Sequence, residues 1–192
     1  MMRRVLLAGG LTAVVGLGGP SGCATMSPTA GGPVQPPKVE LQRVEVAHYW
    51  PFYLDTKERR GSPLDLAFVF GVENPNDTVL TLEELRFTIA FEPGFEVNTV
   101  SVYENMSIPP RTTNQLRVHA AFDAYTTLLS LLVTGGFRLQ QAGVKAPDQL
   151  KEWWEKVPDF GFQIAVTNGA ALFRNSGGTE SLAYFQGTFP KK

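Results

Sequence analysis

The stretch Leu64-Asp-Leu-Ala-Phe-Val-Phe-Gly-Val72 places a large apolar side chain at every second residue. Side chains two residues apart lie on the same face of a β-strand, whereas a helix needs apolar residues three and four apart. The alternate positions include Asp65 and Gly71, which an exposed face tolerates. The stretch therefore predicts a strand with one face in a hydrophobic core.

Other parts of the chain repeat this alternation between turns that contain Pro, Gly or Asn. We expect strands over residues 39–47, 64–72, 85–91, 95–102, 116–122, 160–166 and 181–189. The first changes phase between Leu41 and Val44, which indicates a β-bulge. Several short alternating strands favour a mainly β protein, with antiparallel sheets that form a two-layer sandwich.

Two segments within residues 123–158 follow a helical period instead. Asp123 can cap the first helix, which we expect to end at Gly135-Gly136. The second begins at Pro147 and ends before Pro158. Their apolar stripes are Tyr125, Leu128, Leu129, Leu132 and Val133 in the first helix, and Leu150, Trp153, Trp154 and Val157 in the second. The sandwich is thus predicted to carry a two-helix insertion at about residues 123–158.

The N-terminus resembles a bacterial lipoprotein signal. Arg3 and Arg4 precede an uncharged apolar run over residues 5–17, which is too short to cross a membrane but suits a signal peptide. The only cysteine, Cys23, follows the small residues Ser21 and Gly22, as in a lipobox, although Pro20 stands where such boxes usually carry Leu. The resemblance implies removal of residues 1–22 and attachment of lipid to Cys23. The alternative is an ordinary secretory peptide cut near Ala24, which leaves no lipid.

Residues 23–37 are rich in Pro and Gly and are predicted to form an extended tether to a folded domain over residues 38–192. Anchored in this way, the protein would belong to the bacterial cell envelope, with the membrane as its partner. Ala24, at the position where enterobacteria read Asp as an inner-membrane retention mark, favours the outer membrane over the inner.

Composition excludes several classes of function. The 192 residues contain 17 Lys and Arg, 18 Asp and Glu, and two histidines, so the net charge of −1 lacks the basic excess of a nucleic-acid-binding protein. One cysteine cannot build a disulfide framework or a Cys-rich zinc module. We expect no metal and no cofactor.

The run from Phe68 to Ile89 resembles the signature of the type 2 late embryogenesis abundant (LEA) family, whose unit is the water stress and hypersensitive response domain. An apolar strand ends in Asn74-Pro75-Asn76 and an apolar hairpin follows. An Ile-Pro element at residues 108–109 and Phe-x-Gly-x-Phe at residues 185–189 also fit. The resemblance covers about residues 39–189, with residues 134–158 as an insertion. It implies an immunoglobulin- or fibronectin-III-like sandwich with a non-enzymatic, stress- or desiccation-related role.

The residues themselves offer little for catalysis. No Gly-x-Ser-x-Gly elbow accompanies His48 or His119, and both histidines fit surface or packing positions. Asn74, Pro75 and Asn76 fit a turn: Pro75 keeps Asn74 extended, and Asn side chains bond locally. We expect no catalytic residue and no enzymatic activity.

The helical insertion leaves a second hypothesis open, that of a carrier or chaperone for a hydrophobic ligand or lipid, with residues 123–158 as the lid. The adjacent Trp153 and Trp154 diverge by about 100° around a helix, so we expect one to pack on the sandwich and the other to half-cover the helix edge. The carrier hypothesis instead predicts a surface for an apolar ligand, an envelope protein or the membrane, formed by Leu128, Leu132, Leu150, Trp153 and Trp154.

Overall fold

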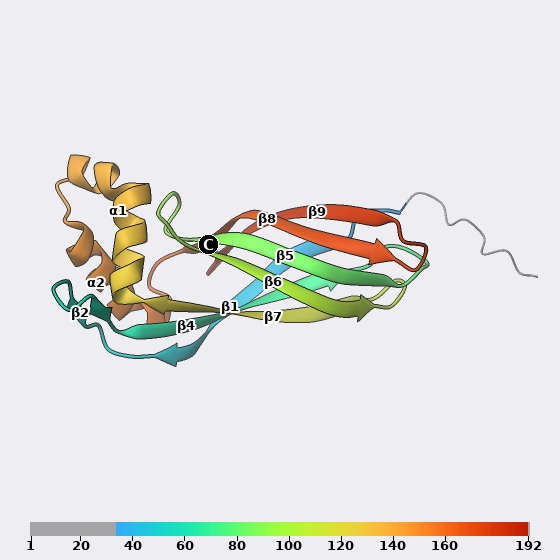
Figure 1. The fold of residues 1–192 in the computed structure, drawn as a ribbon, viewed down its shortest axis with the longest axis horizontal. Coiled ribbons are helices and arrows are strands. Elements are labelled where there is room, and N and C mark those ends of the chain that lie inside the picture. Colours follow the sequence, from blue (N-terminus) through green and yellow to red (C-terminus); the bar gives the residue numbers. More distant parts are fainter. Residues whose placement is uncertain (1–33, 192) are drawn as a thin grey trace, which may run out of the picture. The chain divides into compact units, whose positions relative to one another are not determined.

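Two antiparallel β-sheets dominate the computed structural model, which describes residues 34–191. One sheet has the strand order β1-β4-β7 and the other has the order β6-β5-β8-β9. These strands are β1 Lys38–Tyr49, β4 Pro63–Glu73, β5 Leu80–Phe91, β6 Glu96–Ile108, β7 Thr113–Asp123, β8 Ile164–Asn175 and β9 Glu180–Phe189. The sheets form two layers (Figure 1), so the predicted mainly β, antiparallel sandwich is confirmed.

Aromatic side chains from both sheets fill the space between the layers. The rings of Phe68 and Phe70 on β4 lie 5.3 and 5.1 Å from the ring of Phe87 on β5. Phe185 of β9 lies 5.3 Å from Phe70. The apolar side chains that alternate along residues 64–72 are at most 1% exposed, which confirms the predicted core face of this strand.

The register of β1 against β4 confirms the predicted bulge. The pairing shifts between Leu41 and Arg43, where the alternation of the sequence changes phase. Leu41 and Val44 can therefore both face the core, each 2% exposed, although they are three residues apart.

The helices cover one end of the sandwich. They are α1 Ala124–Gln141 and α2 Ala146–Lys156, followed by the 3₁₀ turn η1 Val157–Asp159. The small hairpin β2 Leu54–Asp55 and β3 Arg60–Gly61 lies at the same end, whereas residues 34–37 lie at the opposite end (Figure 1). Neither described helix is long and apolar enough to cross a membrane.

The predicted start of α1 is correct but its predicted end is wrong. Asp123 caps the helix, accepting hydrogen bonds from the amides of Tyr125 and Thr126 at 2.9 and 3.1 Å. The helix then continues through Gly135 and Gly136 to Gln141. A Cβ atom on Gly135 would lie 2.5 Å from Cδ1 of Phe95, so this glycine permits close packing and does not end the helix.

The strand expected over residues 160–166 starts and ends later than predicted. Phe160 takes a left-handed conformation, with φ of 49°, directly after η1, and β8 begins only at Ile164. The strand continues to Asn175 past an irregularity between Val166 and Gly169, which interrupts the alternation that would have revealed it.

Candidate functional site

Asn74 joins three separate segments at the end of the sandwich opposite the helices. Its side chain is fully buried, and its amide nitrogen donates to the carbonyls of Thr78, Ile108 and Pro109 at 2.9, 3.0 and 3.2 Å. Its side-chain oxygen accepts from the backbone amide of Asn76 at 2.9 Å. The side chain of Asn74 therefore holds the end of β4 against the Ile108-Pro109 element, which lies 34 residues further along the chain.

Asn76 binds the segment that precedes the sandwich. Its side-chain oxygen accepts from the amide of Gln35 at 2.8 Å, and its side-chain nitrogen donates to the Gln35 carbonyl at 2.9 Å. Both hydrogen bonds are to the backbone of Gln35, so they fix the path of the chain next to β1. Asn74-Pro75-Asn76 thus acts as a structural junction between the sandwich and the preceding segment.

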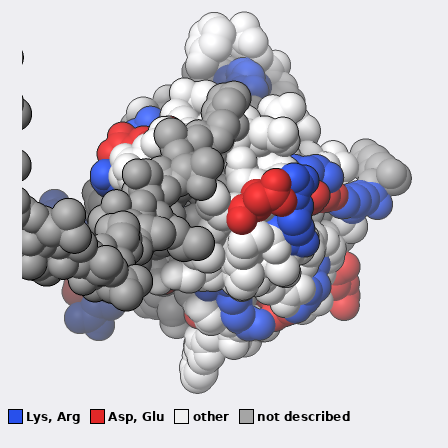
Figure 2. All heavy atoms as spheres, turned by 90° about the vertical axis from the view of Figure 1, so that its right-hand side faces the viewer, with Lys and Arg blue, Asp and Glu red and all other residues white. Residues whose placement is uncertain are grey.

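The same end of the sandwich carries paired charges. Arg111 donates two hydrogen bonds to Asp77, at 2.8 and 3.0 Å, and lowers the pKa of that carboxyl. Arg174 likewise lowers the pKa of Glu83 through a bond of 2.5 Å. Basic and acidic side chains lie next to each other on this end (Figure 2), which leaves no large area of one sign among the residues in view.

The closing Phe185-Gln-Gly-Thr-Phe189 segment also has a packing role. The ring of Phe185 contacts core rings of the opposite sheet, and Phe189 meets Phe160 edge to face at 4.9 Å. A Cβ atom on Gly187 would lie 2.9 Å from Cβ of Leu41 on β1. A glycine at this position lets β9 approach β1 closely.

Both tryptophans of α2 are buried, at 1% and 0% exposed, so the expectation that one would half-cover the helix edge is wrong. Trp153 packs against Phe91, Phe95 and Phe162, with ring centroids 6.1, 5.3 and 6.2 Å apart. Trp154 turns to the other side of the helix, where its indole N–H donates to the carbonyl of Trp50 at 3.0 Å. The two rings diverge as predicted, but neighbouring segments cover each of them.

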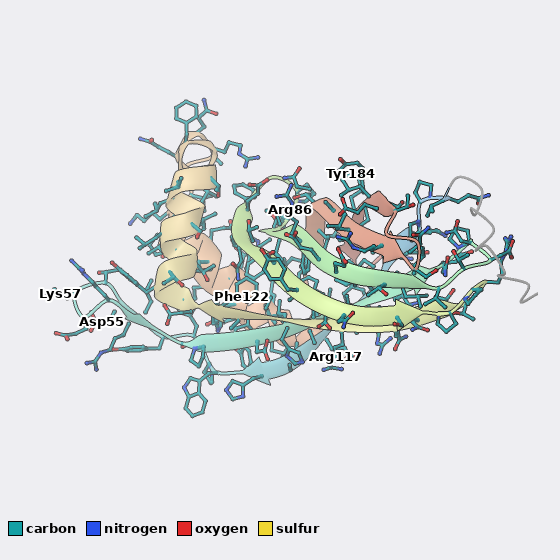
Figure 3. All side chains as sticks on the ribbon, turned by 45° about the vertical axis from the view of Figure 1, so that its right-hand side comes forward. Asp55, Lys57, Arg86, Arg117, Phe122 and Tyr184 are labelled. Carbon is teal, nitrogen blue, oxygen red and sulfur yellow. The ribbon has the colours of Figure 1, made fainter. Side chains whose placement is uncertain are left out.

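The surface predicted for an apolar ligand or partner does not form. Leu128, Leu150, Trp153 and Trp154 are at most 4% exposed and belong to the core, whereas Leu132 is 50% exposed. The four buried side chains, together with Phe91 and with Phe122, which Figure 3 labels near the base of α1, belong to one hydrophobic core beneath the helices. The carrier hypothesis requires an enclosed cavity at that place, and packed side chains occupy it.

The other apolar face of α1 is the one that reaches solvent. Leu129, Leu132, Val133 and Phe137 are 45, 50, 86 and 72% exposed. The apolar stripe predicted for the first helix contains residues of both faces. The helical period of 3.6 residues alone cannot show which of two adjoining apolar faces meets the core. The helix carries no acidic residue on either face, so charge does not mark its outer face in the sequence.

The outer face of the three-stranded sheet holds a cluster of titratable side chains that includes one predicted histidine. Nδ1 of His119 lies 2.8 Å from Asp65, and Nε of Arg117 donates to Nε2 of His119 at 3.4 Å. Arg117 also pairs with Glu45, whose pKa is lowered by the hydrogen bond from Arg43 and by the charge of Arg117. Both ring nitrogens of His119 thus have a side-chain neighbour within hydrogen-bond distance, and His48 is exposed on β1.

Three hollows on the part of the chain that the structure describes are open to solvent. One, of about 440 Å³, lies between the loop at Pro93 and the segment at Gly161. A second, of about 560 Å³, crosses the four-stranded sheet between Arg86 and Tyr184 (Figure 3). A third, of about 620 Å³, lies between the end of α1 and the start of α2. In the part of the chain that the structure describes, no three His, Cys, Asp or Glu side chains are placed to hold a metal ion.

The predicted lipidation residue, Cys23, lies outside the described residues, as do the expected signal peptide over residues 1–22 and most of the tether. The part of the tether that is described, residues 34–37, forms neither helix nor strand.

No family model matches the chain, and no curated protein matches it. Solved structures with a related backbone include a protein from Archaeoglobus fulgidus, at 13% identity over 80% of this chain and 98% of that chain, with a TM-score of 0.39. An Arabidopsis thaliana protein has 12% identity over 82% and 83% of the two chains and a TM-score of 0.45. An LEA-like protein has 10% identity over 81% and 72%, with a TM-score of 0.42. Because these TM-scores are below 0.5, none of the likenesses assigns the chain to a family.

Proposed function

We propose that this chain is a non-enzymatic lipoprotein of the bacterial cell envelope, in which a type 2 LEA-like sandwich has a protective or binding role under desiccation or other stress. The observation that carries the proposal is the junction at Asn74. The residues that resemble the family signature serve the fold: Asn74 bonds to Ile108 and Pro109, and Asn76 bonds to Gln35.

The closing segment adds independent support. Gly187 permits close approach of β9 to β1, and Phe185 fills the core. Signature-like residues that serve packing and backbone bonding suit a protein whose surface, and not a reactive cleft, performs its function. The single Asp65–His119 pair lies on an open sheet face with its ring nitrogens already bonded, which favours a structural role.

The lipid anchor rests on the sequence of residues 1–37. Three features agree: a charged start with a short apolar run, the only cysteine directly behind small residues, and a Pro- and Gly-rich segment before the sandwich. We expect Cys23→Ser to release the protein from the membrane fraction and to leave a larger, unprocessed precursor. Thr25→Ser, two residues away, serves as the control and should fractionate like the unchanged protein.

Protection is tested by drying and rehydrating an enzyme that loses activity on drying, with and without the sandwich domain. We expect the enzyme to keep more activity than with an equal mass of a β-sandwich protein of unrelated surface. Equal recovery with both proteins would remove the protective role from the proposal and leave a binding role.

A further inference from the structure

Helix α1 has two apolar faces, and only one of them packs on the sandwich. The buried face consists of Ala124, Thr127, Leu128, Leu131, Gly135 and Leu139. The outer face consists of Leu129, Leu132, Val133 and Phe137, spaced three, one and four residues apart and 45 to 86% exposed. Val144, in the loop that follows, extends it and is 37% exposed. A contiguous group of exposed large apolar side chains usually marks a contact surface.

The charges near this outer face have one sign. From Ala124 to Pro147 the chain contains Arg138 and Lys145 and no acidic residue, although the whole chain carries a net charge of −1. Both basic side chains are exposed, and Arg138 lies 4.5 Å above the ring of Phe95. Apolar side chains on a segment that also carries basic residues and no acidic ones are typical of helices that lie in the interface of an anionic lipid bilayer.

An open hollow adjoins the outer face. Its volume is about 620 Å³, and its lining includes Leu132, Leu139 and Val144 together with Lys145. Apolar walls with a cation at the rim suit an acyl chain below an anionic headgroup. By contrast, the exposed Leu182 and Tyr184 lie on strand β9, which begins with the acidic Glu180.

We propose that the outer face of α1 contacts the surface of a bilayer that contains anionic lipid, as a second attachment beside the proposed anchor at Cys23. Ten residues separate Cys23 from Val34 and can span roughly 31 Å when extended. A chain held this close to a bilayer meets lipid at a high effective concentration, so a weak contact suffices.

The inference also defines an orientation. The chain enters the sandwich beside Asn76, whereas α1 lies at the other end, beyond the 11 residues of β4 (Figure 1). A strand of that length spans about 36 Å. Helix α1 can therefore reach the bilayer that holds the anchor when the strands run along its surface, and not when the sandwich stands upright on it.

Vesicle flotation tests this contact without the anchor. Residues 31–192 form a compact unit in which the described strands pair with one another, so this chain, which lacks Cys23, can be used alone. We expect it to float with vesicles of phosphatidylcholine and phosphatidylglycerol and less with phosphatidylcholine alone. Val133→Ser with Phe137→Ser should weaken binding about tenfold or more, because both exposed apolar side chains are lost.

The matched control is Leu182→Ser with Tyr184→Ser, which removes two apolar side chains of 44 and 78% exposure from β9 and should leave binding unchanged. The proposal would be overturned if this chain did not float with the vesicles, or if both double variants lost vesicle binding to the same extent. So would a dimer in sedimentation that the α1 substitutions abolish, since the face would then bind a second copy. Because the tested chain has no Cys23, these outcomes do not bear on the lipid anchor.

Discussion

The Asn74 side chain satisfies backbone groups of the turn at residues 76–78 and of the Ile108-Pro109 element, so the stability of the fold should depend strongly on it. In Asn74→Ala the carbonyl of Ile108 loses a partner in a buried place, and the carbonyl of Thr78 and the amide of Asn76 lose theirs in a partly buried one. We expect a loss of about 2–4 kcal/mol in the free energy of unfolding, measured with urea.

Asn114→Ala provides the comparison, because the Asn114 side chain makes one exposed bond, to the carbonyl of Ser107 at 3.0 Å. Its replacement should cost less than about 1 kcal/mol. Equal costs at both positions would show that Asn74 is an ordinary turn residue.

The two tryptophans of α2 differ in their polar atom and should respond differently to the same replacement. Trp154 donates to the carbonyl of Trp50, whereas the buried indole nitrogen of Trp153 has no hydrogen-bond partner among the described residues. Trp154→Phe breaks a bond, while Trp153→Phe removes an unsatisfied donor. We expect the free energy of unfolding, measured with urea, to be about 1 kcal/mol lower for Trp154→Phe than for Trp153→Phe. The reverse order would contradict the assigned partners.

The glycine pair inside α1 offers a test in which neighbouring residues should give opposite signs. A Cβ atom on Gly136 would meet only Cδ2 of Leu132, at an ordinary contact distance of 4.0 Å, so Gly136→Ala should stabilise the helix by about 0.5–1 kcal/mol. Gly135→Ala places a Cβ atom against Phe95 and should destabilise by about 1–3 kcal/mol. Thermal unfolding of both variants measures this difference. Stabilisation by both would mean that α1 does not pack closely on the loop at Phe95.

The elements show which parts of the fold could be predicted. Period-two alternation predicted the seven long strands and the bulge after Leu41, because one face of each strand meets a continuous core. It did not predict the full length of β5 and β6, the shift of β8 or the short hairpin of β2 and β3. The end of α1 was missed because Gly135-Gly136 is a common C-terminal signal, and only the distant Phe95 shows that Gly135 serves packing. The buried face of α1 was missed for a related reason, since Leu131 and Leu132 are equally apolar and only tertiary contacts distinguish them.

The candidate site was predicted in part. The Asn74-Pro75-Asn76 turn was recognised as local chemistry, but its bonds to Ile108 and to Gln35 span 34 and 41 residues and follow only from the fold. The same holds for Trp153 and Trp154, whose cover comes from segments such as Phe95 and Trp50, far away in the chain.

The protein as a whole should lose stability in acid. The pKa values of Glu45, Asp77 and Glu83 are lowered, chiefly by hydrogen bonds from Arg43, Arg111 and Arg174. The unfolded chain then binds protons at a higher pH than the folded one. The stabilisation that these three carboxylates contribute is therefore present above about pH 4.5 and is lost as the pH falls through the lowered pKa values.

We expect the urea midpoint to be constant from about pH 7 to pH 5 and to decrease towards about pH 3. In Asp77→Asn the urea midpoint should fall less towards about pH 3, because the amide does not titrate. The same midpoint at about pH 5 and pH 3 in the unchanged protein would contradict the assigned ion pairs.

The central claim is that a catalytically inert sandwich is fastened to a membrane through its only cysteine. The most direct test is the intact mass of the mature protein extracted from membranes of its bacterial host. We predict a chain that begins at Cys23, with the mass of a diacylglyceryl group on the thiol. A chain that starts near Ala24, or one that retains residues 1–22 with a free thiol, would contradict the claim.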